Sequence, residues 1–577
     1  MTLRTSSAAL AVLGLLTFTG CKDFYDVNTD PLHPSVYTAE QLLPGTQVAM
    51  GTYLGFSLSG LGQATSTLVS QLNSGRGVGS FQQSGSSFSN QWGGLYNDML
   101  ENNELIIKQA TEKNQPGYLG IAQLQKAYVF SIMVDMWGSV PYSEALNGTG
   151  NGTYDRAPRF DEGRDIYLGS ADGKVESLFA LIDKGIANVK LSTSSNGDLI
   201  YGGTPSKWVN FGYALKLKLY NQVRRFSPLP FDLNTEVTTV LGQLQQQPFV
   251  NDFELPYGPS FQPENRNISY LSNYVSPSRE DFISQEFFRM MHRNQDPRIP
   301  FYFYTQARAS GGLSDYDTTV ILERRYSPTG APITLNFATV KLGSTGTLAA
   351  SADNSKLATL PGLYPSGGRF DFGLGTPSSI GVDFSYARGT VAQRFLTTAS
   401  RYFTEAELQL TVFNDPAAAK AAYLRGLAEG FAKVDAIGRA DGATTSVALT
   451  SVTGGTIPSI AAATPAAATY ITAATTRYDY STAPNPPRGI VGVFTTAAQK
   501  LAVIMYEKYV AGFGFGEDIW TDYRRTKYPV IRAPGEVPGT IATGARPDNL
   551  FYDIQEITSN RNAPRDVTGR APFWKVD

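Results

Sequence analysis

Side chains that could perform catalysis or hold a metal are scarce in this chain. It contains two histidines, His33 and His292, and one cysteine, Cys21. Nucleophilic catalysis usually needs a positioned imidazole, and zinc-type centres need several His or Cys ligands close together. The composition therefore predicts a protein that does no chemistry of its own and holds no metal or cofactor. A glycosidase-type carboxylate pair stays open, because Asp and Glu number 50 and no two stand out.

Two local patterns resemble functional sites, but their contexts indicate structural roles. His292 lies beside Arg289 and Arg293 where a helix is expected to end, and a general base would need partners that the sequence does not bring near. The glycine-rich run at 512–516 (GFGFG) follows a helical pattern rather than a strand, so it lacks the setting of a phosphate-binding loop. We interpret both as features of helix ends.

Cys21 follows the pattern of a secretion signal. Residues 8–18 are mostly apolar, a run too short for a membrane-spanning helix of about 20 residues but suited to a signal-peptide core. Two small residues, Thr and Gly, come directly before Cys21, as in a lipobox. The sequence therefore predicts a lipoprotein signal peptide over residues 1–20, lipid attachment at Cys21, and a lipid-anchored tether over residues 21–44.

The overall composition limits the classes of partner. The net charge is −2 over 577 residues, so no basic excess is present to neutralise phosphates, and nucleic acid is not an expected partner. Hydrophobic residues make up 42% and charged residues 17%, which suits a folded, loop-rich exported protein rather than a disordered one. The membrane is therefore expected to be a partner only through the N-terminal lipid.

Aromatic residues are the best candidates for ligand contacts. The chain has 31 Tyr, 32 Phe and 5 Trp, and sugar rings place their C–H faces flat on such side chains. Most aromatics recur at helical spacing and are expected in the core. Those in the irregular middle of the chain are the better candidates, namely Tyr270, Tyr274, Phe301, Tyr302 and Tyr304.

Helices must position these residues, because apolar side chains recur at i, i+3 and i+4 over several segments. The pattern predicts helices over residues 91–113, 118–137, 175–189, 205–225, 391–436 and 495–511. Two stretches lack it, an irregular insert at about 226–390 and an Ala/Thr/Gly-rich insert at about 440–487. Paired helices on either side of an irregular middle are typical of a helical-repeat superhelix.

Several local strings occur in the same order as in one known family. They are DVNTDP (26–31), WGGLY (92–96), DMWGSVPYSEA (135–145), the Trp208 helix with ALKLKL (214–219), DPR (296–298) and EKY…GEDIWTDYRRT (507–526). On these motifs the chain resembles the SusD/RagB family of outer-membrane nutrient-binding lipoproteins, in the branch described as starch-binding and associated with the outer membrane. The 440–487 insert is not part of the family pattern.

The resemblance implies a mainly α fold: a tetratricopeptide-like superhelix of helix pairs, with an irregular, loop-rich ligand-facing region and minor β structure. It implies one such domain over residues 45–577. It also implies a protein anchored in the outer membrane and facing the cell exterior. Such a protein captures glycans or peptides and delivers them to a SusC-like, TonB-dependent outer-membrane barrel.

The motif residues have a physical interpretation of their own. Glu517, Trp520 and Arg524 lie one helical turn apart, so they share a face if this segment is helical. Together with Arg525 they are expected to stabilise the fold rather than contact ligand. The same structural role is expected for the remaining motif residues, namely Trp92, Pro141, Tyr142, Glu144, Asp296 and Arg298.

Two alternative functions remain open from the sequence. One is a surface glycan hydrolase, which the absence of a recognisable catalytic motif disfavours. The other is a structural surface lipoprotein without a ligand. The ligand itself, whether starch, another glycan or a peptide, is not encoded in any motif.

Overall fold

The computed structural model describes residues 37–74, 81, 83–146, 157–276, 279–306, 320–323, 337–340, 358–371, 388–444, 467–479, 496–532, 546–568 and 571–575. Cys21 and the predicted signal peptide lie outside these residues. Helices dominate the described chain, and a single cluster of buried hydrophobic side chains runs through most of it, from Ala39 to Tyr552. The expected mainly α fold is confirmed.

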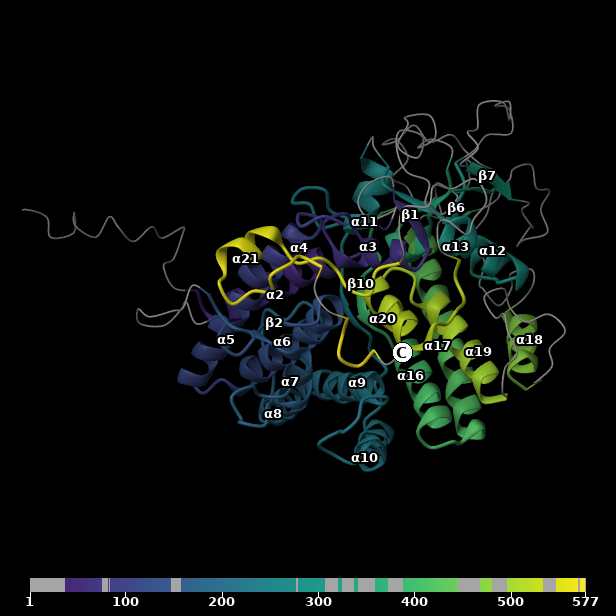
Figure 1. Cartoon of the computed structure of the whole chain (residues 1–577). Coiled ribbons are helices and arrows are strands. Elements are labelled where there is room, and N and C mark those ends of the chain that lie inside the picture. The colour runs from purple at the N-terminus through teal and green to yellow at the C-terminus, as the bar shows by residue number, and fades with distance from the viewer. Residues whose placement is uncertain are drawn as a thin grey trace, which may run out of the picture.

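Helices of the N-terminal half pack one on the next, α5 on α6, α6 on α8, α8 on α9 and α9 on α10 (Figure 1). Their bounds are α2 (Ala39–Leu54), α3 (Leu61–Leu68), α4 (Ser89–Gly94), α5 (Glu101–Glu112), α6 (Pro116–Trp137), α7 (Gly163–Leu168), α8 (Leu178–Lys190), α9 (Pro205–Val223) and α10 (Leu233–Gln246). Side-chain caps and N-terminal prolines begin several of them: Ser177 accepts from the Ala180 N–H at 3.0 Å, and Pro205 opens α9.

Helices of the C-terminal half form a second group beside the first. They are α16 (Thr398–Thr411), α17 (Pro416–Thr444), α18 (Ala467–Asp479), α19 (Thr496–Ala511), α20 (Gly516–Thr526) and α21 (Ile554–Ser559). Helix α16 packs on both α17 and α19, and it also contacts α9 of the first group. The tetratricopeptide-like arrangement of helix pairs therefore includes helices from both sides of the irregular middle of the chain.

The middle of the chain supplies short helices and strands above the second group, whereas the small sheet of β2 and β3 lies beside α6 of the first group (Figure 1). The sheets are β1 (Leu72–Ser74) with β5 (Asp281–Ile283), β4 (Phe253–Leu255) with β10 (Gln393–Leu396), β2 (Val140–Pro141) with β3 (Phe160–Asp161), β6 (Phe303–Tyr304) with β9 (Leu360–Pro361), and β7 (Val320–Glu323) with β8 (Phe337–Val340). The short helices are α11 (Ile268–Tyr270), α12 (Gln285–Arg293), α13 (Ile299–Tyr302) and α15 (Leu363–Ser366).

The structure differs from the sequence expectations at several boundaries. The expected helix at 91–113 is divided into α4, a π-helix η3 (Leu95–Leu100) and α5, with the Tyr53 ring lying against Gly94. The irregular middle also holds a second π-helix, η5 (Leu271–Val275), and the amphipathic helices α10 and α12. The Ala/Thr/Gly-rich insert contains α18 and the end of α17.

Helix α2 begins at Ala39, inside the range predicted for the tether. Thr38 forms a capping box with Gln41, whose side chain accepts from the Thr38 N–H at 2.9 Å. Leu43 is fully buried in the core, so residues 39–44 belong to the helical body. Pro44 is accommodated inside this helix.

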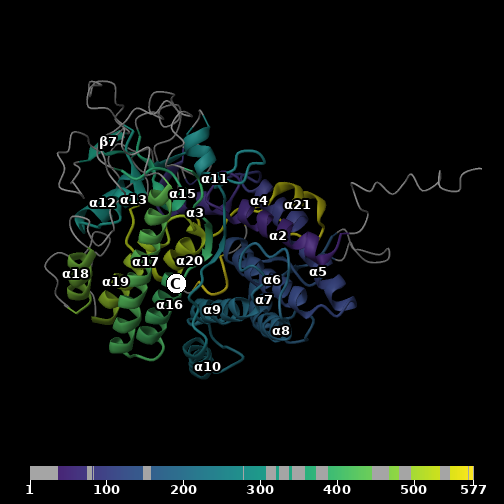
Figure 2. The same ribbon diagram turned by 180° about the vertical axis from the view of Figure 1, so that it is seen from behind.

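The C-terminal segment returns to the N-terminal helices, and Figures 1 and 2 both place α21 beside α2 and α4. The Ile554 N–H donates to the Gly85 carbonyl at 2.8 Å, and Ser89 donates to Asp553 at 2.5 Å. Farther along, the Trp574 indole donates to Asp135 of α6 at 2.8 Å. The two ends of the described chain thus share one core.

Candidate functional site

Three of the five predicted ligand-binding aromatics lie together in the irregular region. Tyr270 and Tyr274 are stacked with ring centroids 5.5 Å apart, and Tyr304 lies 6.1 Å from Tyr274. The faces of these rings are largely occupied: Tyr270 and Tyr304 are buried, and a Cβ on Gly368 would lie 2.3 Å from the half-buried Tyr274 ring. Ligand binding by these tyrosines stays a prediction, and their visible role is packing.

The other two predicted aromatics are buried in different surroundings. Phe301 packs edge-on against Phe370 at 4.8 Å and is fully buried. Tyr302 stacks on Tyr364 with centroids 4.6 Å apart and is 1% exposed. Tyr302 nevertheless lines a cavity, so it is the one of the two whose position is compatible with a ligand contact.

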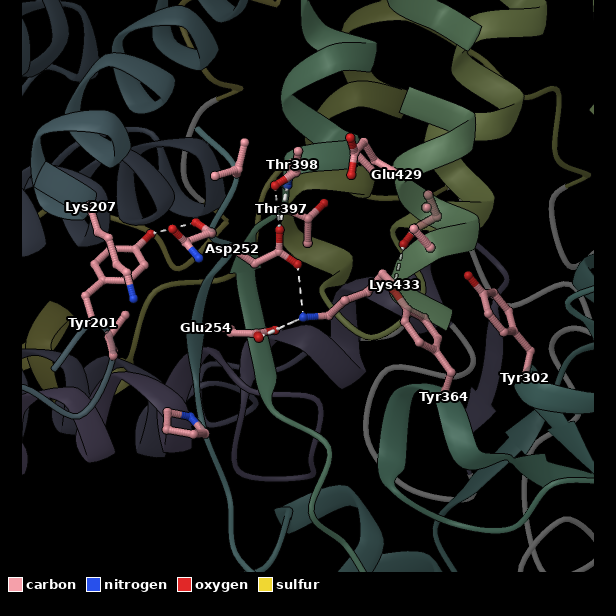
Figure 3. A pocket seen from close by; sticks show the side chains of 18 residues that line it. Tyr201, Lys207, Asp252, Glu254, Tyr302, Tyr364, Thr397, Thr398, Glu429 and Lys433 are labelled. Carbon is pink, nitrogen blue, oxygen red and sulfur yellow. Dashed lines mark hydrogen bonds and ion pairs between the residues drawn. The ribbon is translucent and has the colours of Figure 1, made fainter. Parts of the chain in front are cut away.

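That cavity, which we call the Lys433 cavity, lies where the two groups of helices meet the irregular region (Figure 3). Its walls come from the start of α9, the segment before and through β4, the start of α16, the middle of α17, and the stacked pair Tyr302 and Tyr364. Its volume of about 320 Å³ falls at the lower end of the range for small-molecule sites.

A cluster of charges lies at the centre of the Lys433 cavity. Lys433 donates to both oxygens of Glu254 at 2.7 Å, and its ammonium lies 3.1 Å from Asp252. Asp252 also accepts from the Thr398 N–H at 2.8 Å and from the Thr398 hydroxyl at 2.9 Å. Burial raises the pKa of Glu254, whereas the pKa of Lys433 is raised because its two carboxylate neighbours outweigh its own burial.

Local structure explains how these side chains reach one cavity. Asp252 and Glu254 lie two residues apart around Phe253, which points the other way and stacks on Phe211 at 4.0 Å. On α17, Glu429 and Lys433 lie one helical turn apart and both line the cavity. Alternation in a strand and i, i+4 spacing on a helix thus direct four charged groups to one place.

Sequence reasoning did not identify the charged lining of this cavity. The Asp–Phe–Glu alternation at 252–254 was a usable signal, since it places two carboxylates on one face of a strand. The pairing of that face with Lys433 was not available, because 179 positions separate Glu254 from Lys433. Lys207, at the start of α9, also lines the cavity.

The N-terminal motif residues build an aromatic junction with the C-terminal segment. Trp92 lies 5.2 Å from Trp137 and 5.8 Å from Tyr552, both edge-on. Pro141 accepts from the Tyr96 hydroxyl at 2.7 Å, and Tyr142 packs edge-on against Phe130 at 4.7 Å. Glu144, by contrast, is exposed and accepts from the Arg159 N–H at 3.0 Å.

Asp296 and Arg298 of the DPR motif form a buried ionic network. The Arg298 guanidinium donates to Asp296 at 2.8 Å and 2.6 Å and to Glu507 of α19 at 2.8 Å. It also lies 5.0 Å from the centre of the Phe431 ring. Arg298 therefore joins the irregular region to α17 and α19 from within the core.

The GEDIWTDYRRT motif is helix α20, and Glu517, Trp520 and Arg524 are all buried on it. The Arg524 guanidinium lies 3.7 Å from the Trp520 ring and 5.2 Å from the Trp574 ring, and it donates to the Asp548 carbonyl at 2.7 Å. Burial lowers the pKa of Arg524 to about 9. None of these side chains lines the Lys433 cavity.

Replacing Arg524 with Ala is expected to lower the free energy of unfolding by about 2–3 kcal/mol. The variant loses a desolvated cation–π contact and a charge-assisted hydrogen bond. The measurement is urea unfolding, with Arg439→Ala as the control because its side chain is 68% exposed. Loss of ligand binding with unchanged stability would contradict the structural role.

Replacing Glu517 with Gln is expected to change the dependence of stability on pH. Burial raises the pKa of Glu517 to about 8, so its stabilising contribution is complete below the unfolded pKa near 4.3 and is lost as pH rises through 8. When the pH rises from 5 to 8, the free energy of unfolding should fall by about 2 kcal/mol less in the variant than in the wild type. Each pKa unit corresponds to about 1.4 kcal/mol, and relaxation of the site around the charged Glu517 reduces the loss in the wild type. Denaturant unfolding at both pH values measures this, with the exposed Glu101→Gln as the control.

Two kinds of feature are absent from the described residues. Among them, no group of three or more His, Cys, Asp or Glu side chains is placed to hold a metal ion. Of the helices within the described ranges, none has the length and apolar character needed to cross a membrane.

The fold and the cavity together define a helical-repeat protein with a polar cavity between its two groups of helices. Family comparison gives the particular group. Residues 51–325 match the family described as starch-binding and associating with the outer membrane, and residues 384–568 match the SusD and RagB outer membrane lipoproteins. The chain belongs to the SusD/RagB family of outer membrane lipoproteins.

Solved structures of this family share the fold. A chitin-binding protein is 18% identical with a TM-score of 0.62, over 94% of this chain and 100% of that one. A chitin-binding SusD homologue from Flavobacterium johnsoniae is 18% identical with a TM-score of 0.60, over 93% and 99%. A SusD homologue from Bacteroides fragilis is 16% identical with a TM-score of 0.63, over 94% and 99%. A search of curated proteins gave no match.

Proposed function

We propose that this protein is a cell-surface nutrient-binding lipoprotein that captures glycans or peptides and delivers them to a TonB-dependent outer-membrane transporter. The observation that carries the proposal is the pair of family matches over residues 51–325 and 384–568. The chitin-binding relatives support a glycan as the ligand, and the Lys433 cavity supports binding of a small polar group. In this role the protein is not an enzyme.

The proposed anchor is a lipid on Cys21, after removal of residues 1–20. Acyl chains contribute about 0.8 kcal/mol for each buried CH₂ group, so several chains hold a protein of this size stably at the membrane. Residues 21 to about 38 would then tether the helical body, which starts with the capped helix α2.

The test is affinity purification of the tagged full-length chain from its own outer membrane in mild detergent. We expect a large TonB-dependent barrel to co-purify in stoichiometric amount, and binding of a polysaccharide or peptide from a panel. The Cys21→Ser variant is the control and should leave the membrane fraction. Isolation without any barrel, with no binding across the panel, would contradict the proposal, and release of new reducing ends from a polysaccharide would favour the hydrolase alternative.

A further inference from the structure

A second cavity, which we call the Phe160 cavity, lies next to β2 in the N-terminal half of the fold (Figure 1). One wall comes from the ends of the small sheet of β2 and β3, and the other comes from residues 562–566 of the C-terminal segment. Its volume of about 490 Å³ exceeds that of the Lys433 cavity and falls within the range for small-molecule sites. The two cavities share no lining residue, so the second is a separate candidate site.

Hydrogen bonds hold both walls of the Phe160 cavity in place. The Tyr552 hydroxyl donates to the carbonyls of Trp137 and Ser139, at 2.8 Å and 2.9 Å. In the C-terminal wall, the Asn562 side chain donates to the Ala157 carbonyl at 2.5 Å. The cavity is therefore formed before any ligand arrives, which reduces the ordering cost of binding.

An immobilised aromatic ring lines this cavity. The Phe160 ring stacks on the Trp92 ring with centroids 6.1 Å apart, and the Tyr552 ring lies edge-on to it at 5.6 Å. Trp92 and Tyr552 are buried, whereas Phe160 is half-buried and keeps part of its ring accessible. A fixed, partly accessible ring is a platform on which the apolar C–H face of a sugar can lie.

Polar side chains around the ring supply both acceptors and donors. Glu162 is exposed and accepts from the Ser139 hydroxyl at 3.2 Å, and a carboxylate has about four acceptor positions, so it can also accept from a ligand. The side-chain oxygen of Asn562 accepts from no other described residue. Arg565 is exposed and forms no ion pair or hydrogen bond within the described part of the chain, so its N–H groups are available.

This lining matches a neutral sugar better than a peptide or a charged sugar. A pyranose has an apolar face and a rim of hydroxyls that both donate and accept, which is the pattern of one ring surrounded by polar groups. Apart from the two aromatic rings, the apolar lining consists of Ala563 and Pro564, which offers little contact to the side chains of a peptide. Charges of both signs line the cavity, so a charged sugar would be repelled by one of them.

We propose that the Phe160 cavity is a glycan-binding site that holds two linked neutral pyranose units. One pyranose lies against the accessible part of the Phe160 ring. Its hydroxyls donate to Glu162 and to the side-chain oxygen of Asn562, and Arg565 donates to a hydroxyl oxygen. This inference rests on the proposed function with a glycan as the ligand, and it adds a site outside the irregular region that the family resemblance assigns to ligand binding.

The test is saturation-transfer NMR together with titration calorimetry on the full-length lipoprotein, in a detergent without a sugar headgroup. The probes are three neutral disaccharides, namely cellobiose, maltose and N,N′-diacetylchitobiose. We expect at least one of them to bind to the wild type.

Three variants locate the disaccharide in the Phe160 cavity. Phe160→Leu should weaken binding about tenfold, because the stacking surface is lost. Arg565→Met and Glu162→Gln should each weaken it about fivefold, the effect of losing one hydrogen bond, and both positions are exposed, so folding should not change. The matched controls are Phe261→Leu and Arg439→Met, which lie outside the cavity with side chains 74% and 68% exposed and should bind as the wild type does. Thermal melting of each variant shows that it is folded.

The outcomes separate this inference from the proposed function. Weaker binding in all three cavity variants, with both controls unchanged, supports the inference even without a barrel partner. Disaccharide binding that is unchanged in Phe160→Leu and Arg565→Met overturns the inference and leaves the proposed function standing, with its ligand bound elsewhere. A wild type that binds none of the three probes but co-purifies with a barrel has the same meaning. Absence of every disaccharide, polysaccharide, peptide and barrel interaction overturns both.

Discussion

Replacing Glu407 with Gln should lower the free energy of unfolding by about 3–5 kcal/mol, because it removes the central charge of a buried network. Glu407 of α16 is fully buried and accepts from Arg525 of α20 through both carboxylate oxygens. It also pairs with Arg224 at 2.8 Å and accepts from Asn221 at 2.7 Å, both at the end of α9. A neutral amide would leave two guanidinium groups without sufficient negative charge.

Unfolding is measured by titration with urea rather than with guanidinium chloride, at a single pH and a single salt concentration. Lys420→Met is the matched control: its ion pair with Asp479 is exposed, so a change of at most about 1 kcal/mol is expected. A double variant, Glu407→Leu with Arg525→Met, should recover part of the loss, because it removes buried charges on both sides. If the free energy of unfolding of Glu407→Gln falls by less than about 1 kcal/mol, helices α9, α16 and α20 are held together by packing alone.

Replacing Trp574 with Ala should cost about 3–5 kcal/mol, the range for deleting a large buried aromatic. Trp574 is fully buried three positions before the last residue of the sequence, and its indole N–H donates to Asp135 at 2.8 Å. Asp135 also accepts from the Tyr167 hydroxyl at 2.8 Å, and its pKa is raised to about 6 because of burial. The variant therefore loses ring packing and a donor to a buried carboxyl.

Trp574→Phe separates the two contributions. It keeps most of the ring and removes the N–H, so it should cost about 1–2 kcal/mol more than a change at an exposed ring, because Asp135 Oδ1 then keeps only the Tyr167 hydroxyl as a donor. Phe261→Ala is the exposed control, since Phe261 is 74% exposed, and a change within about 0.5 kcal/mol is expected. Equal stability of Trp574→Ala and the wild type would mean that the C-terminal segment does not contribute to the core.

Periodicity predicted the long helices well and the short elements poorly. The apolar spacing over residues 205–225 placed α9 correctly, and the spacing over residues 118–137 placed α6, because each helix follows its own local pattern. In the middle of the chain β4 pairs with β10 across more than a hundred positions, and α12 has only nine residues. Their stability comes from tertiary packing, which a local window does not contain.

The candidate functional residues show the same difference between what a local pattern predicts and what only tertiary contacts determine. Family motifs identified Arg298, Trp520 and Arg525, which the structure places in the core. The charged lining of the Lys433 cavity comes from three separate segments, and only the alternation of Asp252 and Glu254 was visible in the sequence. Tyr302 was selected as one aromatic among several, and the stack on Tyr364 that positions it joins residues 62 positions apart in the chain.

The contact between Trp574 and Asp135 has a consequence for the order of events during synthesis. The two residues are 439 positions apart, so helix α6 cannot complete its buried hydrogen bonds until the last few residues have been made. Contacts of such long sequence separation form late and slowly. The N-terminal helices therefore reach their final stability only after residues 571–575 have been made.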